Sequence, residues 1–268
     1  MVEATADGVS FRSVGLGLVK HNIPVLPPTK DNSLEIAGAD GEVDFGSTYG
    51  PRVFDLECVL IADDPTLDYH RRVAKMAALF NVKKGDIPFT FSDLPNKRYM
   101  GRYAGTMPID KIIFDGNVTL PIKMHNPWPD SLQDTELREY GEGLEYGQGY
   151  FYAGTSYFEI ISSGQKVIVE NEGSEIGYPL IRITGAFTDL SMSDGKQILT
   201  FSGGTISSDV LEIDCDLKKC RVRLNGVNAY SRSNGVFFEL NPGETEFTVN
   251  ATAPNFTIEF IYHYKYLY

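Results

Sequence analysis

The chain has 268 residues, 42% of them hydrophobic and 12% aromatic, so it is long enough for two domains with packed cores. The formal net charge of −12 is uneven: residues 1–130 carry 14 Lys and Arg against 17 Asp and Glu, whereas residues 131–268 carry 10 against 19. This composition excludes a disordered chain, and it argues against specific nucleic-acid binding, which needs clustered Lys and Arg.

The first half contains short runs rich in β-branched and aromatic residues, which indicate an antiparallel β-protein. The segment RVFDLECVLIAD, residues 52–63, has the alternation of a strand with one face in water. Asp115-Gly116 predicts a hairpin turn after the run KIIF. We therefore expect the first domain, residues 1–130, to be a β-sandwich.

One amphipathic helix is predicted within this β-rich half, over residues 65–82. Asp63 or Asp64 would cap its first amides, and Pro65 suits the first helical position. Lys83, Lys84 and Gly85 would end it. The spacing predicts an apolar stripe that covers the open face of a sheet, formed by Tyr69, Val73, Met76, Ala77 and Phe80.

A Pro-rich joint around residues 126–134 predicts a domain boundary near residue 130. After it, strand-like runs recur at the spacing of a β-sandwich, which predicts a second sandwich over residues 131–268. The expected strands are QKVIVEN, PLIRITG, FTDLSM, KQILTFSG, DVLEIDC, CRVRLNG, GVFFEL, TEFTVNA and FTIEFIYHYKYL. Asp194-Gly195 and Asn225-Gly226 predict two-residue hairpin turns between some of these runs.

No motif predicts catalysis or a cofactor. Asp214 and Asp216 fall on one strand face, and a solvated face is a simpler interpretation of them than a calcium or glycosidase site. Cys215 and Cys220 are more simply adjacent buried thiols than a bridge, and no group of residues has zinc-site spacing. No apolar run approaches the ~18 residues of a membrane span, and no secretory signal opens the chain, so we expect synthesis in a cytosol without membrane insertion.

The order of these pieces is more informative than any one piece. A strand with the pattern R-x-F-x-L-x-C is followed by the single helix, then by DIPFTFSDLPNKRYMGRY, and finally by a sandwich that contains LNPG before an aromatic strand. This order resembles the distal tail protein (Dit) family of long, non-contractile-tailed bacteriophages and prophages. The family-like segment is matched here by Phe89, Phe91, Asp93, Pro95 and Tyr99.

The resemblance implies a virion structural protein without enzymatic activity, located at the tail tip and made in the bacterial host cytoplasm. It implies that the first domain forms a ring of six copies and that the second domain is galectin-like or carbohydrate-module-like. The implied partners are the tail tube protein, the tail-associated lysin or fibre protein, and a receptor-binding protein or cell-surface glycan. Edges or hairpins from residues 40–62 and 86–105 would extend sheets between copies.

Two other functions stay open from the sequence. A glycan-binding module or glycan-active enzyme would use the second sandwich, with Tyr150, Tyr152 and Tyr157 as candidate contacts. A hub of a contractile-phage baseplate or a related injection system would use a similar domain in another assembly.

Overall fold

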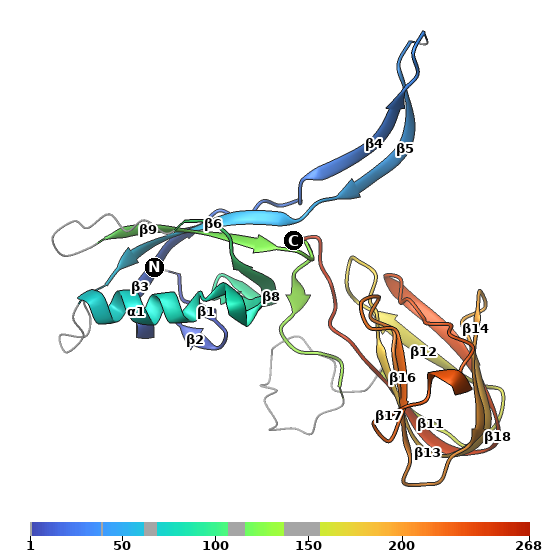
Figure 1. Cartoon of the computed structure of the whole chain (residues 1–268). Coiled ribbons are helices and arrows are strands. Elements are labelled where there is room, and N and C mark those ends of the chain that lie inside the picture. The colour runs from blue at the N-terminus through green and yellow to red at the C-terminus, as the bar shows by residue number, and fades with distance from the viewer. Residues whose placement is uncertain (1, 39, 62–68, 107–115, 137–155) are drawn as a thin grey trace. The chain divides into compact units, whose positions relative to one another are not determined.

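A computed structural model of the chain describes residues 2–38, 40–61, 69–106, 116–136 and 156–268. The chain forms two compact units, each with its own core (Figure 1). Unit 1 consists of Met1–Asp130 together with Leu267–Tyr268, and unit 2 consists of Ser131–Tyr266. The last two residues therefore belong with the first unit, although the sequence predicts one uninterrupted domain from residue 131 to residue 268. Within the described part of the chain, no helix has the length and apolar character needed to cross a membrane.

Unit 1 is built on one curled antiparallel sheet with the strand order β2-β1-β7-β8-β9-β6-β3, and β10 also pairs with β8. A bridge between Val2 and Leu18 brings the β1 side of the sheet next to β3, so the sheet closes around a single core rather than forming two separate stacked sheets. The strands are β1 (Ala4–Ala6), β2 (Val9–Ser10), β3 (Leu16–His21), β6 (Arg52–Leu60), β7 (Ile87–Phe91), β8 (Leu94–Tyr103), β9 (Asn117–Met124) and β10 (Asp130–Ser131).

Strand β6 follows the alternation that its sequence predicts. Every second residue from Arg52 to Leu60 is buried, while Val53, Asp55 and Glu57 are exposed. The buried residues join an aromatic and aliphatic core that includes Phe11, Phe54, Leu56, Phe89 and Tyr99. Phe11 comes from the 3-10 turn η1 (Phe11–Val14), and the period of two in β6, β7 and β8 places the other side chains on the inner face of the sheet.

The described part of the helix, α1 (Tyr69–Leu79), lies along the sheet of unit 1 (Figure 1). Met76 and Phe80 are buried and Val73 is half-buried. The predicted stripe is wrong at Ala77, which is exposed, while Leu79 is buried instead. Positions 76, 79 and 80 follow the i, i+3, i+4 spacing that points inward.

The helix also ends earlier than the predicted residue 82. Asn81 adopts an extended conformation and its side chain accepts a hydrogen bond from the Lys83 amide, which begins a separate 3-10 turn, η2 (Val82–Lys84). An Asn that caps a new turn competes with helix continuation. The predicted start, Asp63 to Pro65, and the side chain of Tyr69 lie outside the described residues.

Unit 2 contains one eight-stranded antiparallel sheet that folds over itself into two layers. Its path runs β11-β18-β13-β15-β16-β17, with β12 paired to β18 and β14 paired to β13. The strands are β11 (Tyr157–Ile160), β12 (Gln165–Asn171), β13 (Leu180–Ser193), β14 (Ile198–Gly204), β15 (Val210–Asp214), β16 (Arg221–Leu224), β17 (Val227–Asn228) and β18 (Gly243–Ile261).

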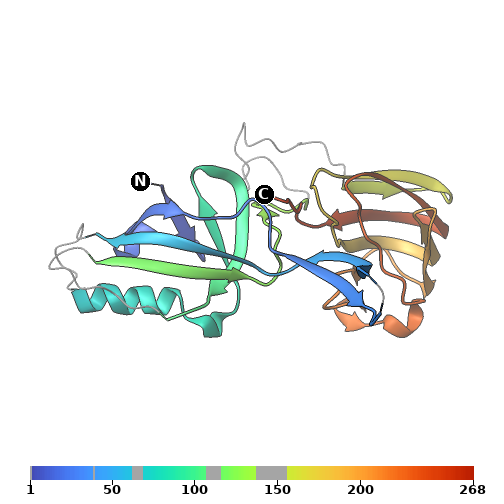
Figure 2. The same cartoon turned by 90° about the horizontal axis from the view of Figure 1, so that it is seen from above.

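Two long strands, β13 and β18, run through both layers (Figures 1 and 2). One half of each pairs with β15 and β11, and the other half pairs with β14 and β12. The sequence predicts four shorter strands here, namely PLIRITG, FTDLSM, TEFTVNA and FTIEFIYHYKYL. In the structure Gly185, Asp189 and Ala253 have positive φ and bend the strands without ending them.

Two local predictions in unit 2 need correction. The run GVFFEL is not a strand: Leu240 forms only an isolated bridge with Gly177, although Phe238 and Leu240 are buried in the core. The turn at Asp194-Gly195 is four residues long rather than two, because Asp194 Oδ1 accepts hydrogen bonds from the Lys196 and Gln197 amides. Asn225-Gly226 does form the predicted two-residue turn, with positive φ at both residues.

Candidate functional site

The most exposed element of unit 1 is a β-hairpin formed by β4 (Thr29–Glu35) and β5 (Glu42–Tyr49), which we call the arm. Every residue of both strands is exposed, and the two strands form a separate two-stranded sheet. Figure 1 shows the arm extending away from the sheet that contains β6 and β9. An isolated hairpin is marginally stable in water, so this arm has the properties of an element that requires a partner.

The arm is amphipathic, although no other described segment of the chain covers either face. Leu34 lies directly opposite Val43, and Ile36 and Phe45 continue that spacing of two along the chain. The alternate positions carry Ser33 opposite Asp44 and Glu35 opposite Glu42. One face is therefore apolar and the other acidic. The exposed fractions on the apolar face are 55% for Leu34, 51% for Ile36, 43% for Val43 and 66% for Phe45.

The base of the arm is fixed to the body of unit 1. The Gly50 amide donates a hydrogen bond of 2.7 Å to the Pro28 carbonyl, which closes the hairpin at its root. Tyr49 packs edge-on against Trp128, with ring centroids 5.2 Å apart. These contacts define where the arm leaves the body, while its outer part carries the exposed apolar face.

Arg52, the first residue of β6, is fully buried and lies close to this root in the chain. Its guanidinium donates to the Pro24 carbonyl at 3.2 Å and to the Leu267 carbonyl at 2.5 Å, while its Nε has no hydrogen-bond partner among the described residues. Burial lowers the pKa of Arg52 from its ordinary value. One buried cation therefore holds the segment before the arm and the last residues of the chain against the same strand.

The family-like residues fall in and beside the hairpin β7–β8. Phe89, Phe91 and Tyr99 are buried in the core of unit 1, and burial raises the pKa of Tyr99 to about 12. Pro95 is exposed at the start of β8. Asp93 Oδ2 lies 2.7 Å from His21 Nε2, which links the β7–β8 turn to the end of β3. Four of the five residues, all except Pro95, therefore form structural contacts within unit 1.

Unit 2 carries a row of polar residues across one face of its sheet. The strand registers place these residues directly opposite one another, in the order Tyr157, Glu259, Arg182, Glu212, Arg223 and Asn228. The neighbouring positions, such as Ile183 and Ile213, point into the core. The row thus lies on the outer face of this layer. Its four central residues, Glu259, Arg182, Glu212 and Arg223, alternate in charge.

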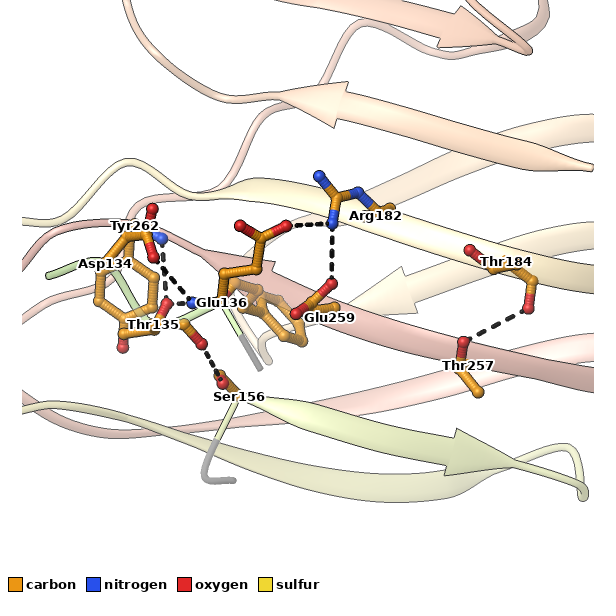
Figure 3. A network of polar contacts seen from close by, with 10 residues as sticks. Asp134, Thr135, Glu136, Ser156, Arg182, Thr184, Thr257, Glu259 and Tyr262 are labelled. Carbon is orange, nitrogen blue, oxygen red and sulfur yellow. Dashed lines mark hydrogen bonds and ion pairs between the residues drawn. The ribbon is translucent and has the colours of Figure 1, made fainter. Parts of the chain in front are cut away.

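Arg182 is the best-connected member of this row (Figure 3). Its Nη1 donates to Glu136 Oε1 at 2.7 Å and to Glu259 Oε2 at 3.1 Å. The hydrogen bond to Glu136 raises the pKa of Arg182 above its ordinary value, with further support from the neighbouring glutamates. Thr135, the residue before Glu136, exchanges backbone and side-chain hydrogen bonds with Phe260 and Tyr262, so this segment lies along the end of β18 (Figure 3).

The residues weighed for glycan binding are not brought together by the described structure. Tyr157 is half-buried on β11, while Tyr150 and Tyr152 lie outside the described residues. Asp214 is buried and forms ion pairs with Lys219 and Arg221. In the described ranges of the chain, no group of His, Cys, Asp or Glu residues is arranged to hold a metal ion.

The three cysteines are unpaired thiols. Burial raises the pKa of Cys58 and of Cys215 to about 12, which keeps both in the unreactive thiol form near neutral pH. Cys220 is half-buried, in the turn before β16.

The sequence-based interpretation missed the apolar face of the arm. The predicted ranges for contacts between copies, 40–62 and 86–105, include β5 but leave out β4, and residues 86–105 contain the β7–β8 hairpin of the main sheet. The signal was present as alternation at Leu34, Ile36, Val43 and Phe45. Alternation of this kind usually means that the apolar side is buried in the same chain, so sequence alone does not reveal its exposure.

Comparison with known proteins identifies both units. Residues 11–124 match the family model of the phage tail protein RIFT-related domain, and residues 172–264 match the C-terminal domain of siphovirus-type tail components. The distal tail protein of Bacillus phage SPP1 is 26% identical over 198 residues, which cover 71% of this chain and 68% of that protein.

Solved structures agree with this assignment at the level of the fold. The crystal structure of SPP1 Dit, described as a paradigm of hub adsorption apparatus in phages that infect Gram-positive bacteria, superposes with a TM-score of 0.73 at 19% identity and covers 99% of both chains. A chain of the phage p2 baseplate in its activated, calcium-bound conformation matches with a TM-score of 0.51 at 9% identity, covering 99% of this chain and 98% of that one. Because the two family models together match well over half of its residues, the chain belongs to the distal tail protein family and is a structural component of a siphovirus tail.

Proposed function

We propose that this protein is a ring-forming hub of the tail tip, in which the arm of each copy packs its apolar face on the next copy. The observation that carries the proposal is the exposed apolar face formed by Leu34, Ile36, Val43 and Phe45. At about 25 cal/mol per Å² of apolar surface removed from water, covering such a face contributes several kcal/mol to association.

A second copy of the chain is the occupant that best fits the chemistry of unit 1. Residues 1–130 are near neutral, with 14 basic against 17 acidic residues, so copies repel one another weakly. The body also exposes apolar side chains, including Val19 on β3 at 55% and Val53 on β6 at 49%. An arm on one copy that meets a different patch on the next copy is a heterologous contact, which closes into a ring when the rotation allows it.

In this proposal the ring contains six copies and joins the tail tube protein on one side to the tail-associated lysin or fibre protein on the other. Unit 2, with 10 basic against 19 acidic residues in the second half of the chain, supplies the contacts with receptor-binding parts. Family membership and the SPP1 protein's description as part of a hub adsorption apparatus support these roles.

The test is a charge placed on the apolar face of the arm. Native mass spectrometry and negative-stain electron microscopy of the full chain, alone and mixed with its tail tube protein, should show closed rings. Phe45→Asp should give monomers under the same conditions, because a carboxylate would have to be buried in the contact.

Ser33→Asp is the matched control, since it adds the same charge to the acidic face of the same hairpin. It should leave ring formation unchanged. Rings formed equally well by Phe45→Asp would refute the role of the arm, and a monomeric wild-type chain in the presence of the tube protein would refute the hub itself.

A further inference from the structure

Unit 2 contains a groove at a distance along the chain from the arm. Its volume is about 340 Å³, and it is lined by Cys220, Arg221, Val222, Arg223, Asn228 and Tyr230. This size lies at the lower end of the range for small-ligand sites. The lining comes from the hairpin β16–β17 and from the short 3-10 turn η3 (Tyr230–Arg232) that follows it.

The groove is the most basic place in an acidic unit. Of the ten Lys and Arg residues in positions 131–268, four lie within residues 218–223. Two of these four, Arg221 and Arg223, line the groove and point to the same side of β16, because Val222 between them is buried in the core. Asp214 and Asp216 neutralise part of this cluster, so an anion that approaches unit 2 meets less repulsion here than over most of the remaining surface.

The two arginines differ in how far they are neutralised. Arg221 Nη2 lies 3.0 Å from Asp214 Oδ2, so its charge is already engaged. Arg223 is half-buried, and the described part of the chain gives its side chain no ion pair and no hydrogen bond. Glu212 lies opposite it in register on β15 without forming an ion pair, and Glu212 also interacts electrostatically with Arg182. Arg223 thus has its donors available for a ligand.

The other side of the groove offers an amide and an aromatic ring. Asn228 lies opposite Arg223 on β17, and its Oδ1 accepts a hydrogen bond of 3.0 Å from the Tyr230 amide. This contact fixes the side chain of Asn228 and leaves its NH₂ group as a donor. The ring of Tyr230 stacks on Phe237, with centroids 6.3 Å apart and an interplanar angle of 25°, yet 46% of the residue is exposed.

This combination fits a ligand that has both an oxyanion and a sugar ring. A guanidinium binds phosphate or carboxylate through two parallel hydrogen bonds. The exposed face of an aromatic ring is electron-rich and packs against the C–H bonds of a sugar, while an amide donor binds hydroxyl oxygens. An acidic peptide fits less well, because the groove offers no deep apolar pocket for an anchoring side chain and β17 is only two residues long.

We propose that the groove formed by Arg221, Arg223, Asn228 and Tyr230 binds a sugar that carries a phosphate or carboxylate group. Arg223 holds the oxyanion, Asn228 donates to a ring hydroxyl, and Tyr230 supports the ring. Charged sugars of this class occur as repeating units of polymers, so a low affinity at one groove is compatible with strong attachment when several copies of the protein act together. The inference does not depend on ring formation.

The test uses the full chain and four small probes. Glucose 1-phosphate and glucuronate combine a ring with an oxyanion, whereas glucose and inorganic phosphate each supply only one part. Titration followed by NMR should show both charged sugars binding about tenfold or more tightly than glucose or phosphate. Saturation-transfer signals should come from the ring protons, and the better of the two charged sugars identifies the anion.

Arg223→Gln should weaken the binding of the charged sugars about tenfold or more. Arg223→Lys should lose less affinity, because lysine keeps the positive charge without the planar guanidinium. Tyr230→Ala should reduce the ring-proton signals. Lys196→Gln removes one positive charge from an exposed turn of the same unit and should leave the affinity for the charged sugars unchanged. Thermal unfolding of each variant separates lost binding from lost folding.

Three results would overturn the proposal. Two of them are that inorganic phosphate, or a short polyglutamate peptide, binds as tightly as the charged sugars. The third is that Arg223→Gln is folded and binds the charged sugars as tightly as the wild type does. Native mass spectrometry separates a failure of the groove proposal from a failure of the hub proposal. Arg223→Gln should still form rings, because the groove is not part of the arm.

Discussion

Arg52 is the residue whose position is hardest to explain by packing alone. A fully buried guanidinium is costly to desolvate, and the described residues provide two backbone carbonyls rather than a carboxylate to compensate for this cost. One acceptor precedes the arm and the other is Leu267. We infer that the residue is retained because it fixes these two chain segments to β6.

This view predicts the behaviour of Arg52→Met. The substitution should destabilise unit 1 by about 1–3 kcal/mol, because two buried carbonyls lose their donor while part of the desolvation cost is removed. Hydrogen exchange should also become faster at residues 264–268. Urea denaturation and exchange mass spectrometry measure the two effects.

Arg102→Met is the control for this prediction. The Arg102 side chain is 43% exposed, pairs loosely with Asp86 at 3.7 Å and lies 2.9 Å from His125 Nε2, so its removal from this solvent-exposed cluster should change the free energy of unfolding by less than about 1 kcal/mol. Unchanged exchange near Leu267 in Arg52→Met would show that other contacts hold the end of the chain.

At the scale of elements, the long strands β13 and β18 give unit 2 its two layers. Their bends depend on residues with positive φ, and Gly185 is the most constrained of them. Its φ is +132°, and a Cβ placed there would lie 2.6 Å from the Asn255 carbonyl oxygen on the paired strand. Backbone atoms of a central strand cannot move aside easily, so the bend requires glycine.

Gly185→Ala should therefore destabilise unit 2 by about 2–4 kcal/mol, from the combined steric and conformational cost. Gly195→Ala provides the comparison, because Gly195 has φ +82° in an exposed turn with nothing within 4 Å of an added Cβ. That variant should lose only about 1 kcal/mol. Equal losses in the two variants, measured by thermal unfolding, would show that the contact with Asn255 has little effect.

The bends in β13 and β18 also explain why the sequence predicts some strands of unit 2 at their observed bounds and divides others. Regular alternation predicts β12 at its observed bounds, because nothing interrupts the period of two between Gln165 and Asn171. Gly185 and Ala253-Pro254 resemble chain breaks locally, and only the pairing partners show that β13 and β18 continue past them. The residues of GVFFEL have strand propensity, but core burial of Phe238 and Leu240 takes precedence over sheet pairing there.

The candidate site was less predictable than the fold for a related reason. The arm and the groove are both defined by what surrounds them. No described element covers Phe45, and Arg223 meets Asn228 and Tyr230 only through the turn at Asn225-Gly226. Sequence patterns give the direction in which a side chain points, whereas exposure and neighbours follow from the tertiary structure.

At the scale of the whole molecule, the chain passes between its units twice, after Asp130 and again after Tyr266. Among the described residues, the buried core of unit 2 lies between Ile160 and Tyr262, with Phe158 and Tyr264 packed against it. Unit 1, in contrast, includes Leu267 and Tyr268, with Arg52 and Lys97 as hydrogen-bond donors to their backbone carbonyls. The two units therefore differ in how far each depends on the rest of the chain.

This asymmetry predicts how the two halves behave when separated. Residues 131–266 should fold alone with one cooperative transition, because their core is complete. Residues 1–130 should melt about 4–10 °C below unit 1 in the full chain, since Arg52 then lacks its Leu267 acceptor and about 1–3 kcal/mol is lost. In the Arg52→Met background, cutting the chain should lower the melting temperature of unit 1 much less, because the interaction is already absent. Scanning calorimetry of the four proteins measures this coupling, and an equal decrease with and without Arg52 would mean that the last two residues stabilise unit 1 through other contacts.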